Sequence, residues 1–316
     1  MYKDRTVAVV VPAYNEESQI GKVLTGMPEI VDHIVVVDDA SKDATASVVE
    51  EFRKKEKERI VLLRHSRNLG VGGAILTGYE WTRAHGVDVS VVMAGDGQMD
   101  PEDLPDLVEP IVSGEADYVK GNRLFTGESW ERMPKLRYLG NSALSLFTKI
   151  ASGYWHVADF QCGYTSISLD ALKRISLDRV YTRYGFPNDF LVVLNVYNFR
   201  VKDVPVRPVY NVGETSGIRL WKVVPRLSFL LARRFFWRMK EKYVIRDFHP
   251  LVFFYLVGII LYHPGVIFGL YLLVYRIVKG PVAPTSALFA ALLIISGLQF
   301  LFFAMWFDMD YNRRLK

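Results

Sequence analysis

Three oxygen-bearing side chains, those of Asp96, Gln98 and Asp100, follow a short apolar run and are separated by one residue each. Carboxylate and amide oxygens at this spacing suit a hard cation such as Mg²⁺ or Mn²⁺, which in turn would neutralise a diphosphate. The simpler alternative is a polar loop in which Asp100 caps a helix that starts at Pro101. We expect Asp96 and Gln98 to be metal ligands and Asp100 to be the cap.

Short apolar runs alternate with amphipathic stretches over the first third of the chain. Runs rich in β-branched residues predict buried strands, and helical spacing of apolar residues predicts the helices between them. This alternation predicts an α/β fold with a mostly parallel sheet covered on both faces. The expected strands are Thr6–Val11, His33–Val37, Ile60–Arg64 and Val87–Met93, and the expected helices are Ser18–Met27, Asp43–Lys57 and Gly72–His85.

Polar clusters follow all four expected strands, at 12–17, 38–43, 68–70 and 96–98. Parallel sheets bind ligands beyond the carboxyl ends of their strands, so we expect these loops to form one active-site cleft. Ser41 is expected to cap the helix that follows it. The glycines that begin at Gly70 are expected to allow a close backbone approach.

Two long apolar stretches, roughly 251–274 and 284–307, dominate the C-terminal part of the chain. Each exceeds 20 residues with almost no charge, which is enough to cross a hydrocarbon core of ~30 Å. They explain why half of the 316 residues are hydrophobic and why the mean hydropathy is +0.13. Basic residues are denser before the first stretch and after the second, which predicts that both ends of this hairpin are cytoplasmic.

The segment before the first apolar stretch, 218–243, mixes apolar and basic residues at near-helical spacing. It suits a helix in the membrane interface whose basic side faces lipid phosphates. That basic side includes Arg233, Arg234 and Arg238. A surface helix packed on the first domain is the alternative. The net charge of +5 lies mainly here, so it indicates anionic lipid rather than nucleic acid as the partner.

The single cysteine, Cys162, excludes an intrachain disulfide and a cysteine-based metal cluster. We expect it to be a small buried residue rather than a nucleophile. The first apolar run is too short for the core of a signal peptide.

Five motifs in order give the sequence a family resemblance: VVVPAYNEE, VVVDDASKDAT, NLGVGGA, GDGQMD and DFQCGY. Over roughly residues 5–220 the chain resembles glycosyltransferase family 2, inverting GT-A enzymes that use nucleotide-sugars. Within it, the chain looks most like the polyprenyl-phosphate glycosyltransferases, the group of dolichol-phosphate mannose and glucose synthases. Ala94 stands where the family usually has the first aspartate of Asp-x-Asp. Fewer protein oxygens are left, so the cation would rely more on diphosphate oxygens and water.

The resemblance implies roles for particular residues. Arginine suits the lipid phosphate because its planar donors match phosphate oxygens. Asp189 would hold a sugar hydroxyl rather than act as a base, because a phosphate acceptor is largely deprotonated near neutral pH. The expected donor-binding residues are Pro12, Tyr14, Glu16, Asp39, Gly70, Asp96, Gln161, Asp189 and Arg219; the acceptor-phosphate residues are Arg123, Arg137 and Asn141; the catalytic residues are Asp96, Arg123, Arg137 and Asp159; and the metal ligands are Asp96 and Gln98.

The sequence thus predicts a GT-A catalytic domain at 1–217, amphipathic juxtamembrane helices at 218–248 and a transmembrane hairpin with a short basic tail at 249–316. The expected reaction moves a sugar from a nucleotide-sugar to a polyprenyl or dolichyl phosphate at the cytoplasmic face, with inversion. UDP-glucose or UDP-N-acetylglucosamine is the first choice of donor and GDP-mannose the second. The alternatives are a polysaccharide-type membrane glycosyltransferase, against which the lack of a Gln-x-x-Arg-Trp element speaks, and a non-enzymatic scaffold with a degenerate GT-A domain. Self-association is left open.

Overall fold

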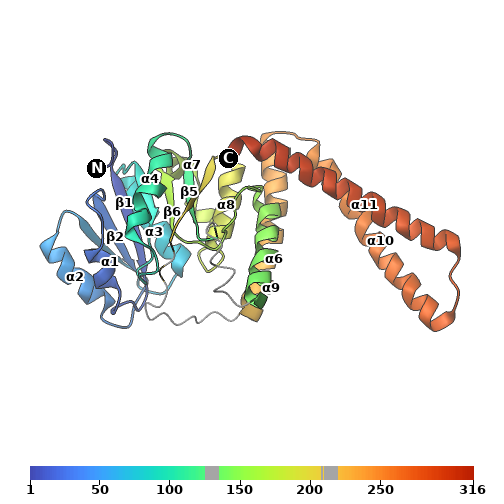
Figure 1. The fold of residues 1–316 in the computed structure, drawn as a ribbon, viewed down its shortest axis with the longest axis horizontal. Coiled ribbons are helices and arrows are strands. Elements are labelled where there is room, and N and C mark those ends of the chain that lie inside the picture. The colour runs from blue at the N-terminus through green and yellow to red at the C-terminus, as the bar shows by residue number, and fades with distance from the viewer. Residues whose placement is uncertain (125–134, 208, 210–219) are drawn as a thin grey trace. The chain divides into compact units, whose positions relative to one another are not determined.

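The computed structural model describes residues 1–124, 135–207, 209 and 220–316, without the side chains of 135–143 and 220–223 (Figure 1). The chain divides into two compact units. The first comprises Met1–Phe235 with Leu315–Lys316, and the second comprises Phe236–Arg314.

A seven-stranded mixed sheet forms the centre of the first unit, in the order β3-β2-β1-β4-β6-β5-β7. The first four strands pair in parallel, β6 runs antiparallel to both of its neighbours, and β5 and β7 are parallel. All strands except β6 therefore point their carboxyl ends to one edge of the sheet. The strands are β1 (Val7–Ala13), β2 (His33–Asp38), β3 (Ile60–Arg64), β4 (Val89–Val92), β5 (Tyr118–Asn122), β6 (Thr165–Ser168) and β7 (Val201–Pro205).

Helices cover both faces of this sheet, as the α/β prediction requires. The odd-numbered valines of β1, Val7 to Val11, belong to one buried cluster with residues of α1, α2 and α4. Successive side chains of a strand point to opposite faces, so Val10 meets the other helix layer. There a Cβ on Gly78 of α3 would lie only 2.2 Å from a methyl carbon of Val10, so glycine allows this helix to lie against the sheet. These helices are α1 (Ile20–Thr25), α2 (Thr45–Lys55), α3 (Val71–Ala84) and α4 (Leu104–Val112).

The expected strands are confirmed, with ends that shift by at most two residues. The three expected helices are also confirmed: the first two are each four residues shorter, and the third keeps its length but starts one residue earlier. The first helix is shorter because its capping residue is Gln19 and its chain turns at Gly26, ahead of Pro28. The later helices of the first unit are α6 (Lys135–Ser152), α7 (Leu169–Arg174), α8 (Phe186–Val196) and the start of α9 (Leu220–Lys240), with short 3₁₀ turns η1 (Pro101–Asp103) and η2 (Leu177–Arg179).

The second unit is built around a helical hairpin, α10 (Leu251–Lys279) and α11 (Pro284–Tyr311). Both helices are long and apolar enough to cross a membrane. Glycines allow them to pack closely, as at Gly297, where a Cβ would lie 2.5 Å from the backbone nitrogen of Tyr262. Small residues at such contacts are typical of helix pairs in membranes. A π-helix, η3 (Glu241–Arg246), precedes the hairpin and a 3₁₀ turn, η4 (Asn312–Leu315), follows it.

The prediction that the basic side of the juxtamembrane helix faces lipid phosphates is wrong for two of the three arginines named for it. Arg238 is fully buried, and its Nη1 and Nη2 donate to the two carboxylate oxygens of Asp308 at 2.8 and 2.9 Å. Arg234 is mostly buried and pairs with Asp189. Arg233 is exposed, as expected. The spacing of basic residues along a helix does not reveal acidic partners that lie far away in the sequence.

Candidate active site

The loops after β1 and β2 are joined by reciprocal hydrogen bonds. The backbone N–H of Asn15 donates to Ser41 Oγ at 3.0 Å, and the N–H of Lys42 donates to Asn15 Oδ1 at 2.9 Å. Glu16 is held in the same way, by its N–H to Thr45 Oγ1 at 2.8 Å. The predicted capping role of Ser41 is therefore wrong, because Ala44 is the capping residue of α2 and the Ser41 hydroxyl is used between the loops. Together the two loops form one rigid part of the edge.

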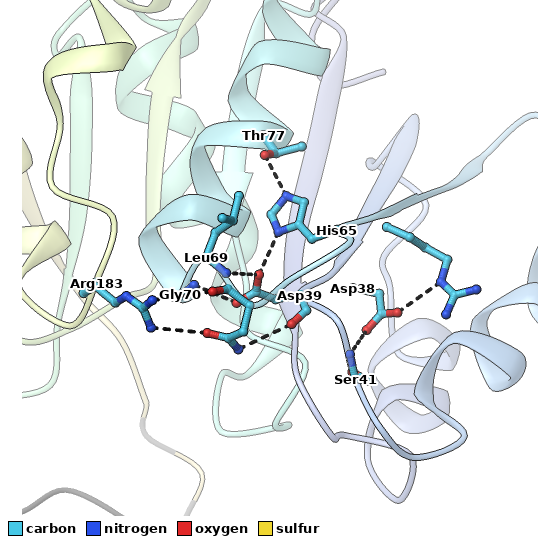
Figure 2. A network of polar contacts seen from close by, with 10 residues as sticks. Asp38, Asp39, Ser41, His65, Leu69, Gly70, Thr77 and Arg183 are labelled. Carbon is cyan, nitrogen blue, oxygen red and sulfur yellow. Dashed lines mark hydrogen bonds and ion pairs between the residues drawn. The ribbon is translucent and has the colours of Figure 1, made fainter.

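Asp39 lies at the centre of a second set of contacts (Figure 2). Its Oδ1 accepts from His65 Nδ1 at 2.7 Å and from the N–H of Leu69 at 2.8 Å, and its Oδ2 accepts from the N–H of Gly70 at 2.8 Å. Gly70 has a φ of +90°, a conformation that favours glycine, and the expected close approach at these glycines is made by the segment that contains Thr182. Asp39 therefore fixes the loop after β3 and leaves one acceptor position among the described residues.

The loop after β4 carries the predicted metal ligands. Its chain is fixed to the first loop by the N–H of Gly95, which donates to the carbonyl of Pro12 at 3.2 Å. Asp96 Oδ1 accepts from the N–H of Gln98 at 3.1 Å. The helix-capping role of Asp100 is confirmed, because its Oδ1 accepts from the N–H of Glu102 at 3.0 Å.

Glu16 and Asp96 form an acidic pair across the first and fourth loops. Partial burial, followed by the negative charges of Asp96 and Asp43, raises the pKa of Glu16 to about 7. A carboxyl whose pKa is raised by neighbouring carboxylates marks a place where a cation would be stabilised. The described residues contain no cluster of three or more histidine, cysteine or acidic side chains arranged to hold a metal ion. Any cation here would need additional oxygens from a ligand or from water.

On the other side of the edge, Arg123 follows β5 and pairs with Asp159. Arg123 Nε and Nη2 donate to the two carboxylate oxygens at 2.7 and 3.1 Å, and the N–H groups of Gln161 and Cys162 each donate to Oδ1 at 3.1 Å. Burial alone would raise the pKa of Asp159, but the contacts with Arg123 outweigh it and lower the pKa. The carboxylate therefore stays charged and orients Arg123, while the fully buried Lys120 donates to the carbonyl of Cys162.

These two sides of the edge meet in a small pocket. It is lined by Gln98 from the loop after β4, Arg123 after β5 and Tyr164 before β6. Cys162 also lines it and is buried and unpaired with another cysteine, as predicted. The geometry thus brings the predicted metal ligand Gln98 and the predicted phosphate-binding Arg123 to one pocket.

Among the described residues, the remaining predicted site residues lie outside this pocket lining. Pro12 is buried, Tyr14 is exposed at the tip of the first loop, and Gln161 has a buried Nε2 with no hydrogen-bond partner in the described part of the chain. Asp189 is fully buried on α8, where it accepts from Arg234 Nη2 at 2.8 Å and from the N–H of Tyr181 at 2.7 Å. A sugar hydroxyl can reach Asp189 only if Arg234 moves. The side chains of Arg137 and Asn141, and all of Arg219, lie outside the described residues.

Sequence reasoning missed several residues at this edge. His65 and Lys120 were not singled out, although both come at or beside the end of a strand. Asp203 was missed as well; burial is the main reason that its pKa is raised to about 6. The position of His65 after the third strand was the one usable signal, because side chains at that edge face the expected cleft.

The sequence between residues 8 and 176 matches the model of glycosyl transferase family 2. This match covers more than half of the chain, and the motifs in it lie on the loops described above. The chain belongs to this family. It is a glycosyltransferase with a GT-A fold.

Named relatives share this catalytic part. The UDP-N-acetylglucosamine–dolichyl-phosphate N-acetylglucosaminyltransferase of Methanococcus voltae is 31% identical over 66% of this chain and 87% of its own length. An undecaprenyl-phosphate mannosyltransferase of Micrococcus luteus is 32% identical over 63% of this chain and 82% of its own length. Among solved structures, glucosyl-3-phosphoglycerate synthase from Mycobacterium tuberculosis, in complex with Mn²⁺, uridine diphosphate and phosphoglyceric acid, superposes with a TM-score of 0.52 at 20% identity, over 74% of this chain and 78% of that one. That similarity shows the shared fold.

Proposed function

We propose that this protein transfers a sugar from a nucleotide-sugar to a polyprenyl or dolichyl phosphate at the cytoplasmic face of a membrane, with inversion. UDP-glucose or UDP-N-acetylglucosamine is the favoured donor, and GDP-mannose is the second choice. The observation that carries the proposal is the pocket shared by Gln98 and Arg123. In this small pocket a residue proposed to bind the cation of the donor diphosphate lies near a residue proposed to bind the acceptor phosphate. Relatives named for lipid-phosphate acceptors match over the same region.

The residues of the fourth loop fit a divalent cation. Asp96 and Gln98 offer oxygen ligands on one short loop, and the negative charge of Asp96 contributes, after burial, to the raised pKa of the neighbouring Glu16. Mg²⁺ commonly takes one or two carboxylates and completes its shell with phosphate oxygens and water, which suits the loss of an aspartate at Ala94. When bound, Mg²⁺ or Mn²⁺ would supply a Lewis acid that neutralises the diphosphate.

The reaction needs no strong base from the protein. A phosphate monoester has a second pKa near 6, so an oxygen of the acceptor carries its negative charge already near neutral pH. That oxygen attacks the anomeric carbon on the face opposite the diphosphate. The bond from the anomeric carbon to the diphosphate breaks, and its electron pair leaves with the nucleoside diphosphate. Inversion follows from this single displacement.

Arg123 would bind the acceptor phosphate, and Asp159 would hold Arg123 in place. Asp159 contacts the guanidinium through Nε and Nη2 and so fixes its plane. A guanidinium fixed by a carboxylate loses little conformational freedom when it binds an anion. Arg137, Asn141 and Arg219 keep their predicted roles as proposals, the first two at the acceptor and the third at the donor.

The second unit would hold the enzyme in the membrane. Helices α10 and α11 contain 29 and 28 residues, so each is roughly 42 Å long, which exceeds a hydrocarbon core of ~30 Å. Basic residues precede the first helix and follow the second, as with Lys240 and Arg313. The positive-inside rule then puts both ends of the hairpin in the cytoplasm, on the side of the soluble donor.

Matched arginine variants test the proposal. The full chain, in lipid nanodiscs with Mg²⁺ or Mn²⁺, is given radiolabelled nucleotide-sugars and a polyprenyl phosphate. Arg123→Gln is expected to lower transfer by about 100-fold, because a charged contact to phosphate is lost. Arg200→Gln is the control, since Arg200 pairs with Asp117 with the same Nε and Nη2 geometry at the opposite edge of the sheet. Absence of lipid-linked sugar with every donor from a folded wild-type protein would refute the proposed acceptor.

A further inference from the structure

Asp39 has a nearly filled set of hydrogen bonds, and the way it is filled limits what else it can bind. A carboxylate has about four acceptor positions, two on each oxygen. Here Oδ1 takes two donors, His65 Nδ1 and the N–H of Leu69, whereas Oδ2 takes one, the N–H of Gly70 (Figure 2). One position on Oδ2 is therefore open among the described residues.

His65 is itself fixed on both ring nitrogens. An ionised carboxylate can only accept, so Nδ1 of His65 carries the hydrogen towards Asp39. Nε2 lies 2.9 Å from the hydroxyl of Thr77 on α3, within hydrogen-bond distance. The His65 side chain is 10% exposed and that of Asp39 is 3% exposed. The histidine is thus a mostly buried, oriented donor that keeps one position of Oδ1 occupied.

We infer that His65 makes Asp39 selective for a base with a single imide N–H, that of uracil, against guanine. This inference rests on the proposed role of Asp39 in donor binding. Uracil presents one N–H between two carbonyl oxygens, which matches one open acceptor position. Guanine presents two adjacent donors, a ring N–H and an amino group, which a carboxylate can accept together only if both oxygens are open. With Oδ1 filled by His65, one guanine donor stays without a partner in a nearly buried site, a loss that lowers affinity about tenfold or more.

The effect of His65 on Asp39 is indirect, so it is a positioning residue that determines specificity. Its loss opens Oδ1 to a second donor and also loosens the carboxylate. Both changes reduce the preference for uracil. Both ring nitrogens of His65 are engaged by Asp39 and Thr77. The change is therefore expected in nucleotide affinity and in KM, with a much smaller change in kcat.

The test compares binding of UDP and GDP to the full chain in nanodiscs with Mg²⁺, by calorimetry. The wild-type protein is expected to bind UDP at least tenfold more tightly than GDP. In His65→Phe, which keeps a ring but removes the donor, this ratio is expected to fall about tenfold. His65→Gln supplies an amide N–H and is expected to restore part of the preference. His85→Phe is the control, because His85 is an exposed histidine that stacks on Trp81.

The outcomes separate this inference from the proposed function. A wild-type protein that transfers sugar to the lipid but binds GDP as tightly as UDP overturns the inference and leaves the function in place. If the UDP-to-GDP affinity ratios are as predicted but no lipid-linked sugar forms, the proposed lipid-phosphate acceptor is refuted and the inference stays in place. A His65→Phe protein that keeps the wild-type ratio also overturns it. If His65→Phe does not fold, Thr77→Val is measured in its place. Because this variant loses the hydroxyl that orients the His65 ring, its preference for UDP over GDP must also fall below that of the wild-type protein.

Discussion

The pKa of Glu16 makes a prediction about stability that is separate from catalysis. Its raised value of about 7, against an ordinary value of 4.5, means that the folded protein binds more protons than the unfolded chain between these pH values. Stability contributed by this group is therefore lost as pH rises from 4.5 to 7. The shift corresponds to about 3 kcal/mol at 1.36 kcal/mol per pKa unit, which partial exposure to solvent reduces to about 1–2 kcal/mol.

Glu16→Gln should remove this loss. Thermal unfolding of the wild-type protein and the variant is compared at pH 5 and at pH 8, without nucleotide or divalent cation. The variant is expected to gain roughly 2–6 °C in Tm relative to the wild-type protein at pH 8, and little at pH 5. Glu29→Gln, at an exposed site on another loop, is the control and should follow the wild-type protein.

The same unfolding experiment can be repeated with a divalent cation and nucleotide. Mn²⁺ with UDP should reduce the difference at pH 8, because positive charge beside Asp96 favours the ionised form of Glu16. Equal pH dependence in the wild-type protein and Glu16→Gln would refute the electrostatic account of this acidic pair.

Three further predictions concern single positions. Asp96→Asn should lower sugar transfer about 100-fold or more in the radiolabel assay and abolish the cation dependence of UDP binding, whereas Asp100→Asn, which only weakens a helix cap, should retain most activity; equal losses would remove the metal assignment. Arg234→Leu leaves the Asp189 carboxylate buried without its partner and should lower the free energy of unfolding of the first unit by about 3–5 kcal/mol, measured by denaturant titration; an unchanged midpoint would show that the pair contributes nothing. Gly297→Leu should prevent the close packing of α11 on α10, which engineered cysteine pairs across the hairpin would report as lost cross-linking; undiminished cross-linking would contradict the packing argument.

The sheet could be predicted from the sequence because its strands are short, rich in valine and followed by polar loops. Ile60–Arg64 was placed at its observed ends for this reason. The sheet order was harder, since β6 lies between β4 and β5 and runs the other way. This arrangement brings Asp159 beside Arg123, so their pairing could not be derived from spacing.

The partners of buried charges were equally hidden. Asp189 and Arg234 are 45 residues apart, and Arg238 and Asp308 are 70 apart. Periodicity shows that a charged residue lies on one side of a helix, but it does not show whether that side faces solvent or an acidic partner. The contacts of Asp39 were missed for a related reason, because they depend on how the loop after β3 folds back over the loop after β2.

The most direct test of the account is the structure of its product. The purified full chain is incubated with UDP-glucose or UDP-N-acetylglucosamine, in which the sugar is α-linked, and with polyprenyl phosphate and Mg²⁺, and the lipid product is analysed by NMR. The account predicts a sugar joined to the lipid through one phosphate in the β configuration, with UDP released in equal amount. An α-linked lipid product, or release of free sugar with no lipid product, would contradict it.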